Sequence, residues 1–191
     1  MSEDRLSTYR GKRETAASGE PTGRRRRGHP DPIFVVQRHD ASSLHFDFRL
    51  EVDGVLASWA VPKGPSLDPR DKRLAVQVED HPLDYADFEG RIGAGYGEGT
   101  VIVWDTGTFD NVTERQGEPI ALPDAIEVGH LKVVLHGEKL TGAFALTHTK
   151  MGGDPKNWIL VKVDDDGADR RGRPTSTQNE SVLSGRTNED L

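Results

Sequence analysis

The sixteen residues that begin at Gln37 combine residue types that bind metals and phosphates. They read QRHDASSLHFDFRLEV, and charged or polar residues alternate with apolar ones in the second half. His45, Asp47 and Arg49 therefore share one face of a predicted strand, because successive strand side chains point to opposite sides. His39 precedes a polar bend that can bring it back beside them. Two imidazoles and a carboxylate suit one divalent ion with open coordination positions.

Further cations follow this stretch and indicate a phosphate site. Lys63 lies in PKGP, Arg73 opens the next predicted strand, and Glu79 and His81 share the face of Arg73 by their spacing of two. An arginine offers a planar fork to phosphate oxygens and a lysine a point charge, and a metal polarises phosphorus–oxygen bonds. The alternative is a polar surface strand with incidental histidines and scattered solvated charges.

A second enzyme class also fits part of the pattern. The spacing of His45 and Asp47 is that of iron oxygenases with two histidines and one carboxylate. In such enzymes the third ligand comes from a distant strand, for which the sequence offers His130, His136 and His148. The cations would then serve an acidic co-substrate.

Two other stretches carry weaker signals. The glycine-rich run GAGYGEG over 93–99 is similar to a phosphate-binding loop, but no strand–loop–helix pattern surrounds it, which favours a hairpin connection. The stretch DHPLDYADFEG places Tyr85 and Phe88 near His81. Both aromatic residues are expected to pack, with Tyr85 facing the site.

Composition limits the protein class. The chain has 191 residues, 34% hydrophobic residues, a mean hydropathy of −0.65 and no cysteine, which excludes disulfides and cysteine-rich zinc sites. The start lacks the apolar segment of a secretory signal, and no run is long enough to span a membrane, so we expect a cytoplasmic protein. The net charge is −7, yet residues 1–30 hold eight Lys/Arg against four acids. Such a basic arm can contact a phosphate backbone.

The alternating patterns predict a mostly β protein. The hairpin turn at Asp53-Gly54 pairs Arg49 with Ser58 and Asp47 with Ala60. We expect a compact single domain of about seven to eight short strands, either a β-barrel or a sandwich. On the strand that Arg73 opens, Leu74, Val76 and Val78 are expected to point inward. Strands are predicted over 34–37, 43–52, 55–61, 73–79, 100–104, 108–109, 131–136, 139–147 and 158–163.

The ends of the chain differ in composition from its middle. Residues 1–30 are predicted to be a mostly irregular basic arm with a short helix near Leu6–Arg10. Residues 31–163 form the folded domain. Residues 164–191 have almost nothing apolar to bury and are predicted to be a disordered tail.

Several long stretches together resemble one family. They are FVVQRHDASSLHFDFRLEVDGVLASWAVPKGPSLDP, KRLAVQVEDHPLDYADFEG and YGEGTVIVWDTGTF, with shorter similarities in GEKLTGAFAL and NWILVKVD. The resemblance is to the 3′-phosphoesterase domain of the bacterial end-joining DNA ligase D, which also occurs as a free-standing protein. It covers about residues 9–163.

The resemblance implies roles for individual residues. It makes His39, His45 and Asp47 the metal ligands. It also implies that residues 9–21 contribute to the active site through a KRET…GEP segment, in which Glu14 replaces the usual Asp and Thr15 an aromatic residue. The residues that hold or activate the phosphate would be Arg49, Lys63, Arg73 and His81, and those that line or support the site Gln37, Ser58, Glu79, Tyr85, Arg13, Glu14 and Glu20.

The function that the resemblance implies is repair of 3′ ends on a compact β-barrel. Such Mn²⁺-dependent enzymes remove a terminal ribonucleoside from a primer strand and then the remaining 3′-phosphate, which leaves a 3′-hydroxyl. The partners would be nucleic acid with a 3′ end and the ligase, polymerase and Ku of end joining, at the nucleoid in the cytoplasm. The alternative from another class is a non-catalytic module that binds or scaffolds nucleic-acid ends.

Overall fold

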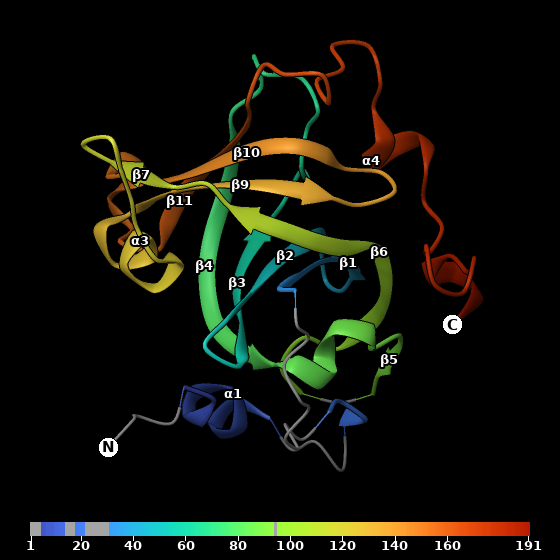
Figure 1. Cartoon of the computed structure of the whole chain (residues 1–191). Helices are drawn as coiled ribbons and strands as arrows, with labels where there is room; N and C mark the ends of the chain where they lie inside the picture. The colour runs from blue at the N-terminus through green and yellow to red at the C-terminus, as the bar shows by residue number, and fades with distance from the viewer. Residues whose placement is uncertain (1–4, 14–17, 22–30, 94) are drawn as a thin grey trace.

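A closed antiparallel β-barrel of eight strands forms the body of the protein (Figure 1). The computed structural model describes residues 5–13, 18–21, 31–93 and 95–191. The barrel order is β1-β2-β3-β4-β11-β10-β9-β6, and β1 also pairs with β6, which closes it. The barrel strands are β1 Ile33–Asp40, β2 Leu44–Val52, β3 Val55–Val61, β4 Arg73–Pro82, β6 Gly99–Asn111, β9 His130–His136, β10 Thr141–His148 and β11 Asn157–Lys162.

Short elements connect and extend the barrel. Strand β5 (Gly90–Ile92) pairs with the outer edge of β6, and β7 (Glu114–Arg115) pairs with β8 (Glu118–Pro119). The helices are α1 Ser7–Lys12, α3 Leu122–Val128 and α4 Pro174–Thr177, with single turns η1 Leu83–Asp87, η2 Met151–Gly153 and η3 Asn188–Asp190. No helix among the described residues is long and apolar enough to cross a membrane.

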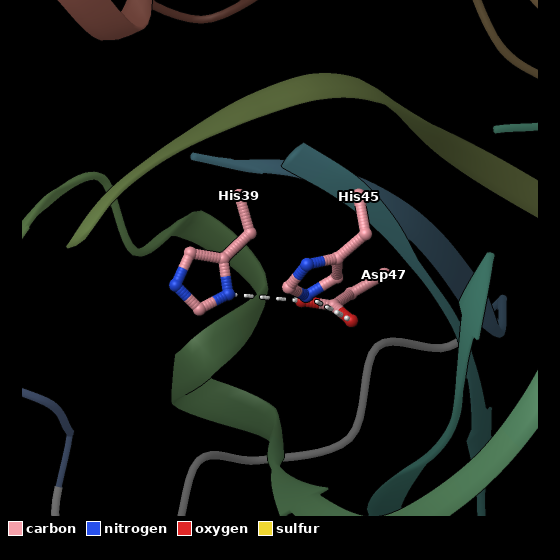
Figure 2. A group of neighbouring side chains, drawn as sticks. All are labelled: His39, His45 and Asp47. Carbon is pink, nitrogen blue, oxygen red and sulfur yellow. Dashed lines mark ion pairs between the residues drawn. The ribbon is translucent and has the colours of Figure 1, made fainter. Parts of the chain in front are cut away.

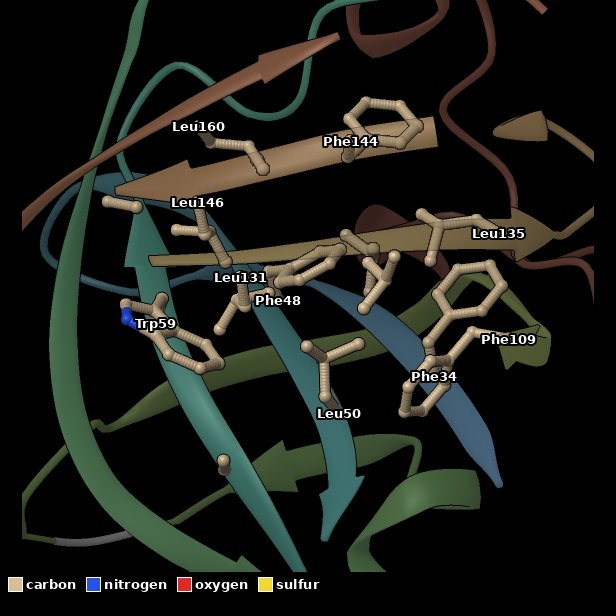
Figure 3. Packing of buried hydrophobic residues seen from close by; sticks show 14 of the residues in the cluster. Phe34, Phe48, Leu50, Trp59, Phe109, Leu131, Leu135, Phe144, Leu146 and Leu160 are labelled. Atoms are coloured by element: carbon tan, nitrogen blue, oxygen red, sulfur yellow. The ribbon is translucent and has the colours of Figure 1, made fainter. Parts of the chain in front are cut away.

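Apolar side chains from every barrel strand fill the interior (Figure 3). Phe48 and Trp59 face each other across β2 and β3, and the Trp59 ring meets that of Trp158 edge to face at 5.6 Å. Because strand residues alternate between two faces, the polar residues between these apolar ones are placed on the outside of β1, β2 and β3. The barrel is one of the two architectures that the strand pattern predicted and the one that the family resemblance implied.

The β2–β3 hairpin has the predicted register. Asp53 and Gly54 form the turn with φ angles of 49° and 80°, which a two-residue turn of this kind requires. Arg49 lies opposite Ser58 and Asp47 opposite Ala60. The positive φ at Gly54 is the reason for glycine at the second turn position.

In strand β4 the side chains do not face as predicted, since Leu74 was expected to point inward. Ala75 is buried in the core, whereas Leu74 is 42% exposed. The β3–β4 register shifts between Leu56 and Ser58, which are paired with His81 and Val78. An extra residue in β4 at this bulge reverses the alternation that a plain spacing of two assumes. The face that carries His81 is thus not the face on which Arg73 starts.

The structure also differs from the predicted disordered tail. Residues 164–191 run along the outside of the barrel, where Asn188 is 3% exposed. Its amide donates to the carbonyl oxygens of Arg38 (3.2 Å) and Thr100 (3.0 Å), and its Oδ1 accepts from Arg38 Nη1 at 2.6 Å. Composition missed this segment because it has few apolar residues; Val182 packs against a buried cluster, and hydrogen bonds attach Asn188. The helix predicted near Leu6–Arg10 is α1, and Arg24 to Arg27 lie outside the described residues.

Replacing Asn188 with alanine should destabilise the protein. The change leaves the buried Arg38 guanidinium without one acceptor, and we expect a loss of about 2 kcal/mol in the free energy of unfolding. Urea denaturation measures it. Asn179→Ala, in the same segment, is the matched control, and equal stability of the two variants would contradict the structural role of Asn188.

Candidate metal centre and phosphate cavity

Three potential metal ligands meet where β1 and β2 pair (Figure 2). His39 is directly opposite His45 in the register, and Asp47 is two residues further along β2. One ligand atom from each lies within 4.8 Å of the others. His39 Nδ1 is 3.6 Å from Asp47 Oδ2, and His45 Nε2 is 3.4 Å from Asp47 Oδ1. Two imidazoles and a carboxylate at these distances can bind one divalent cation.

The outer nitrogen of each imidazole is held by a backbone carbonyl. His39 Nε2 lies 2.7 Å from the oxygen of Gly97, and His45 Nδ1 lies 3.2 Å from that of Ser43. When these nitrogens donate, the lone pairs of His39 Nδ1 and His45 Nε2 point toward Asp47. Metal-binding histidines are oriented in this way by a hydrogen bond to their other nitrogen. The residues present therefore fit a metal site.

Asp47 is held as a carboxylate. Burial alone would raise its pKa, but the Arg49 guanidinium, together with the hydrogen bonds that His39 and His45 donate when the nitrogen facing Asp47 carries a proton, holds the pKa of Asp47 well below its usual range. For His45, burial lowers the pKa, and the stronger combined effect of Asp47 and the Ser43 carbonyl raises it above its ordinary value. The site thus keeps one fixed negative charge.

Arg49 lies beside this carboxylate with its guanidinium held on several sides. Its Nη2 is 3.4 Å from Asp47 Oδ2, its Nε donates to Gln37 Oε1 at 2.7 Å, and its Nη1 donates to Ser58 Oγ at 2.9 Å. The Arg49 guanidinium also lies 5.0 Å from the centre of the Tyr85 ring. A fixed planar fork next to a metal site is suited to phosphate oxygens.

The N-terminal segment closes one side of the site through buried ion pairs. Arg13 donates to Glu20 at 2.9 Å and to Glu79 at 2.7 Å. The Tyr85 hydroxyl donates to Glu20 at 2.9 Å, and Lys12 donates to the other oxygen of Glu79 at 3.1 Å. Burial opposes ionisation of Glu79, but the hydrogen bonds from Arg13, Lys12 and the backbone and the charge of Arg13 together outweigh it and lower the pKa of Glu79.

His81 is a neutral imidazole in this arrangement. Burial and the nearby Arg49 and Arg13 guanidinium groups hold its pKa well below the ordinary value. Its Nδ1 lies 2.9 Å from the carbonyl oxygen of Glu79, and its Nε2 lies 3.3 Å from Arg13 Nη2. With Nδ1 donating to that carbonyl, Nε2 is a proton acceptor.

One cavity of about 580 Å³ joins most of these residues. His39, His45 and Asp47, called the metal cluster below because they could bind one ion together, line it with Arg49, His81 and Tyr85. Gln37 and Ser58 lie behind Arg49 and hold its guanidinium. The predicted residues that line the cavity are Arg13, Glu20, His39, His45, Asp47, Arg49, Glu79, His81 and Tyr85.

Besides Gln37 and Ser58, two of the described residues that were predicted for the site, Lys63 and Arg73, are absent from this lining. Lys63 follows the lining residue Pro62 but is itself exposed. Arg73 lies beyond the β4 bulge and is 3.6 Å from Asp71. Glu14 lies outside the described residues.

Sequence reasoning missed two aromatic residues and a lysine at the site. Tyr9 is buried with its ring 5.0 Å from that of His81, and Tyr96 lines the cavity. Lys12 lies 5.0 Å from the centre of the Tyr96 ring. Only the glycine-rich run around Tyr96 carried a signal, because the contacts of Tyr9 and Lys12 depend on how the N-terminal segment docks.

The comparisons with known proteins agree with this geometry. The family of the DNA Ligase D 3′-phosphoesterase domain matches residues 37–148, which is more than half of the chain. The chain belongs to this family. The match begins at Gln37 and includes the three potential metal ligands, Arg49 and His81.

Relatives in several bacteria are similar over almost the whole chain. The multifunctional non-homologous end joining protein LigD of Pseudomonas aeruginosa is 49% identical over 187 residues, which cover 95% of this chain and 21% of that protein. LigD of Mycolicibacterium smegmatis is 42% identical over 85% of this chain and 21% of its own length. The end joining DNA repair protein LigD of Mycobacterium tuberculosis is 45% identical over 84% of this chain and 20% of its own length. The chain thus spans about a fifth of these relatives.

Replacing Arg13 with methionine should loosen the N-terminal segment. The change leaves Glu20 and Glu79 buried without their shared cation, which costs about 3–5 kcal/mol. We expect faster hydrogen exchange over residues 5–13, measured by mass spectrometry. Because the folded-state pKa of Glu79 is lowered, the stabilisation is present above a glutamate pKa of about 4.3 and fades as the pH falls below it.

Arg5→Met is the matched control for this experiment. Arg5 belongs to the same N-terminal segment as Arg13 and pairs with Asp53 and Asp80 of the barrel, but its side chain is 32% exposed. Such a pair contributes about 0–1 kcal/mol. If the two variants exchanged equally, the buried Arg13 network would not be what holds the segment.

Proposed function

We propose that this protein is a Mn²⁺-dependent phosphoesterase that repairs the 3′ ends of nucleic acid. It would remove a 3′-terminal ribonucleoside and then the 3′-phosphate, so that a 3′-hydroxyl is left for repair. The observation that carries the proposal is the metal-binding arrangement of His39, His45 and Asp47 directly beside the fixed Arg49 fork in one cavity. Membership of the phosphoesterase domain family supports the same reaction class.

His39, His45 and Asp47 would hold the metal. When bound, the ion supplies Lewis-acid polarisation of a phosphate oxygen and lowers the pKa of a coordinated water. The lone pairs of the two imidazoles and the ionised Asp47 are positioned for this role by their hydrogen bonds. A metal ligand set of this kind is compatible with several divalent ions, and Mn²⁺ is proposed from the family resemblance.

Arg49 would bind the phosphate and stabilise charge that develops on its oxygens. Its bonds to Gln37 and Ser58 fix the guanidinium before substrate arrives, so that little reorganisation is needed during the reaction. Lys63 is proposed to neutralise the phosphate from the mouth of the cavity, whereas the same role for Arg73 rests on the family resemblance alone. Lys63 directly follows the lining residue Pro62, which supports its reach toward a bound strand.

His81 would transfer protons beside the phosphate. His81 Nε2, which lies 3.3 Å from Arg13 Nη2, would take a proton from an attacking water after Arg13 releases it. The role of donor to the leaving 3′-oxygen requires a protonated ring. The negative charge of a bound phosphate raises the pKa of a nearby imidazole and supports this second role.

Two alternatives have less support. A non-catalytic module that only binds ends has no need of the complete metal and arginine arrangement. The iron oxygenase was expected to take a ligand from a distant strand, but the second histidine of the cluster comes from the neighbouring β1. The other histidines are bonded elsewhere: His130 to Thr147, His136 to Asp110 and His148 to the carbonyl of Pro155.

The biological setting is proposed from the relatives. The names of the Pseudomonas and mycobacterial relatives state a role in non-homologous end joining. We propose that this protein acts on primer–template ends in the cytoplasm, at the nucleoid, with the ligase, polymerase and Ku of that pathway. The basic Arg24 to Arg27 are proposed to add contacts to the phosphate backbone.

Asp47→Asn should abolish both reactions and weaken metal binding while the fold is retained. The amide keeps the shape of the side chain but removes the negative charge between the two imidazoles. Mn²⁺ binding by electron paramagnetic resonance and release of phosphate from a primer with a 3′-phosphate would be measured together. His136→Ala, an exposed histidine outside the cluster, is the control. Near wild-type turnover of Asp47→Asn would show that the ligand assignment is wrong.

The two reactions should respond differently to the sugar. Removal of a ribonucleoside needs a contact to the 2′-hydroxyl, the group that separates RNA from DNA. Phosphate removal needs only the metal and the cations. Replacing the terminal ribonucleotides with deoxynucleotides should therefore suppress nucleoside removal strongly and slow phosphate removal much less. Time courses on matched primers test this, and equal nucleoside removal from both primers would indicate a general 3′ nuclease.

A further inference from the structure

Tyr96 is an exposed aromatic ring on the wall of the catalytic cavity. It is 52% exposed, and it is the one exposed Phe, Tyr or Trp among the described residues. It lines the same cavity as the metal cluster and Arg49. The other aromatic side chain there, Tyr85, is buried and bonded to Glu20. Among the Phe, Tyr and Trp side chains of the described residues, Tyr96 is thus the one that is both on the cavity wall and exposed.

The backbone fixes the Tyr96 loop relative to the metal ligands. Gly97, the next residue, gives its carbonyl oxygen to His39 Nε2 at 2.7 Å. Gly95 and Gly97 have φ angles of 88° and 82°, so both take the left-handed conformation that favours glycine. A group bound on the Tyr96 ring would therefore lie one residue away from the contact that orients a metal ligand.

The surroundings of the ring favour a nucleotide. Lys12 Nζ and Arg13 Cζ lie 5.0 Å and 5.3 Å from the ring centre and bring positive charge to it. On the other side of the loop, Gly95, Gly97 and Arg91 line a second cavity of about 500 Å³. Gly97 lines both cavities, so they adjoin and leave room for a strand longer than one nucleotide. Aromatic rings beside cations are the usual platform for single-stranded bases.

We propose that Tyr96 is a stacking platform for the terminal base of the 3′ strand and positions its phosphate on the metal cluster. The inference rests on the proposed function, and it makes Tyr96 a positioning residue that touches the base rather than the reacting atoms. Stacking accepts every base because each has a π-face, so the contact gives affinity for strand ends without sequence preference.

The test separates stacking from a merely structural role. An all-DNA primer–template that ends in a 3′-hydroxyl and carries 2-aminopurine as its terminal base is titrated in EDTA, so that nothing turns over. Tyr96→Leu should lose the fluorescence quenching and raise Kd roughly 5- to 100-fold. Tyr96→Phe should keep both. Leu183→Ala, an exposed apolar residue outside both cavities, is the control.

A primer without the terminal base completes the experiment. Wild type and Tyr96→Leu should have the same Kd for this abasic primer, because it lacks the base that would stack on the ring. On primers with a 3′-phosphate and Mn²⁺, Tyr96→Leu should raise KM with little change in kcat. Equal Kd of wild type and Tyr96→Leu on the intact primer overturns the inference. A loss that persists on the abasic primer also overturns it, since Tyr96 would then only hold Lys12 and Arg13.

Phosphate release by the wild type tests the proposed function separately from the stacking platform. If wild type releases no phosphate while quenching still depends on Tyr96, the proposed reaction fails and the platform stands. If wild type hydrolyses the 3′ end and Tyr96→Leu matches it in Kd and KM, the reaction stands and the platform fails.

Discussion

The burial of the Arg49 guanidinium is the constraint on which the site depends. A buried cation costs several kcal/mol unless close partners compensate it. Gln37, Asp47 and Ser58 provide this compensation from β1, β2 and β3, and all of them are held at one fixed strand register. A slip by one residue would turn these side chains into the core and the apolar ones outward. The contacts that hold the Arg49 guanidinium therefore also require the correct pairing of β1, β2 and β3.

A second layer of hydrogen bonds connects this centre with the segments that cover it. The Gln37 amide donates to the carbonyl oxygens of Tyr85 and Phe88, which places η1 against the barrel wall. The Tyr85 hydroxyl then bonds to Glu20, and Glu20 is shared with Arg13. A chain of contacts thus runs from β1, which carries the potential metal ligand His39, to the N-terminal segment. Burial of these charged groups lowers the effective dielectric around them and strengthens their electrostatic interactions.

Much of the barrel and of the metal cluster could be predicted from residue spacing. The turn at Asp53-Gly54 fixed the pairing of Arg49 with Ser58, and the polar bend after His39 returned the chain so that His39 meets His45. The β4 bulge could not be predicted, because no residue in that strand marks the point where the alternation reverses. The docking of residues 164–191 was also missed, since backbone groups and Asn188 make contacts that composition does not reveal.

The sequence by itself determined the hairpin, the face of β2 and the residue types of the metal centre. These follow from local rules, the alternation of strand side chains and the geometry of a two-residue turn. Only the tertiary structure decided how distant residues pair around the site. Arg13 and Glu20 reach Glu79 and Tyr85 across more than sixty residues of sequence. Such pairs form because each buried charge needs a partner, and the fold rather than the sequence spacing determines which partner is near.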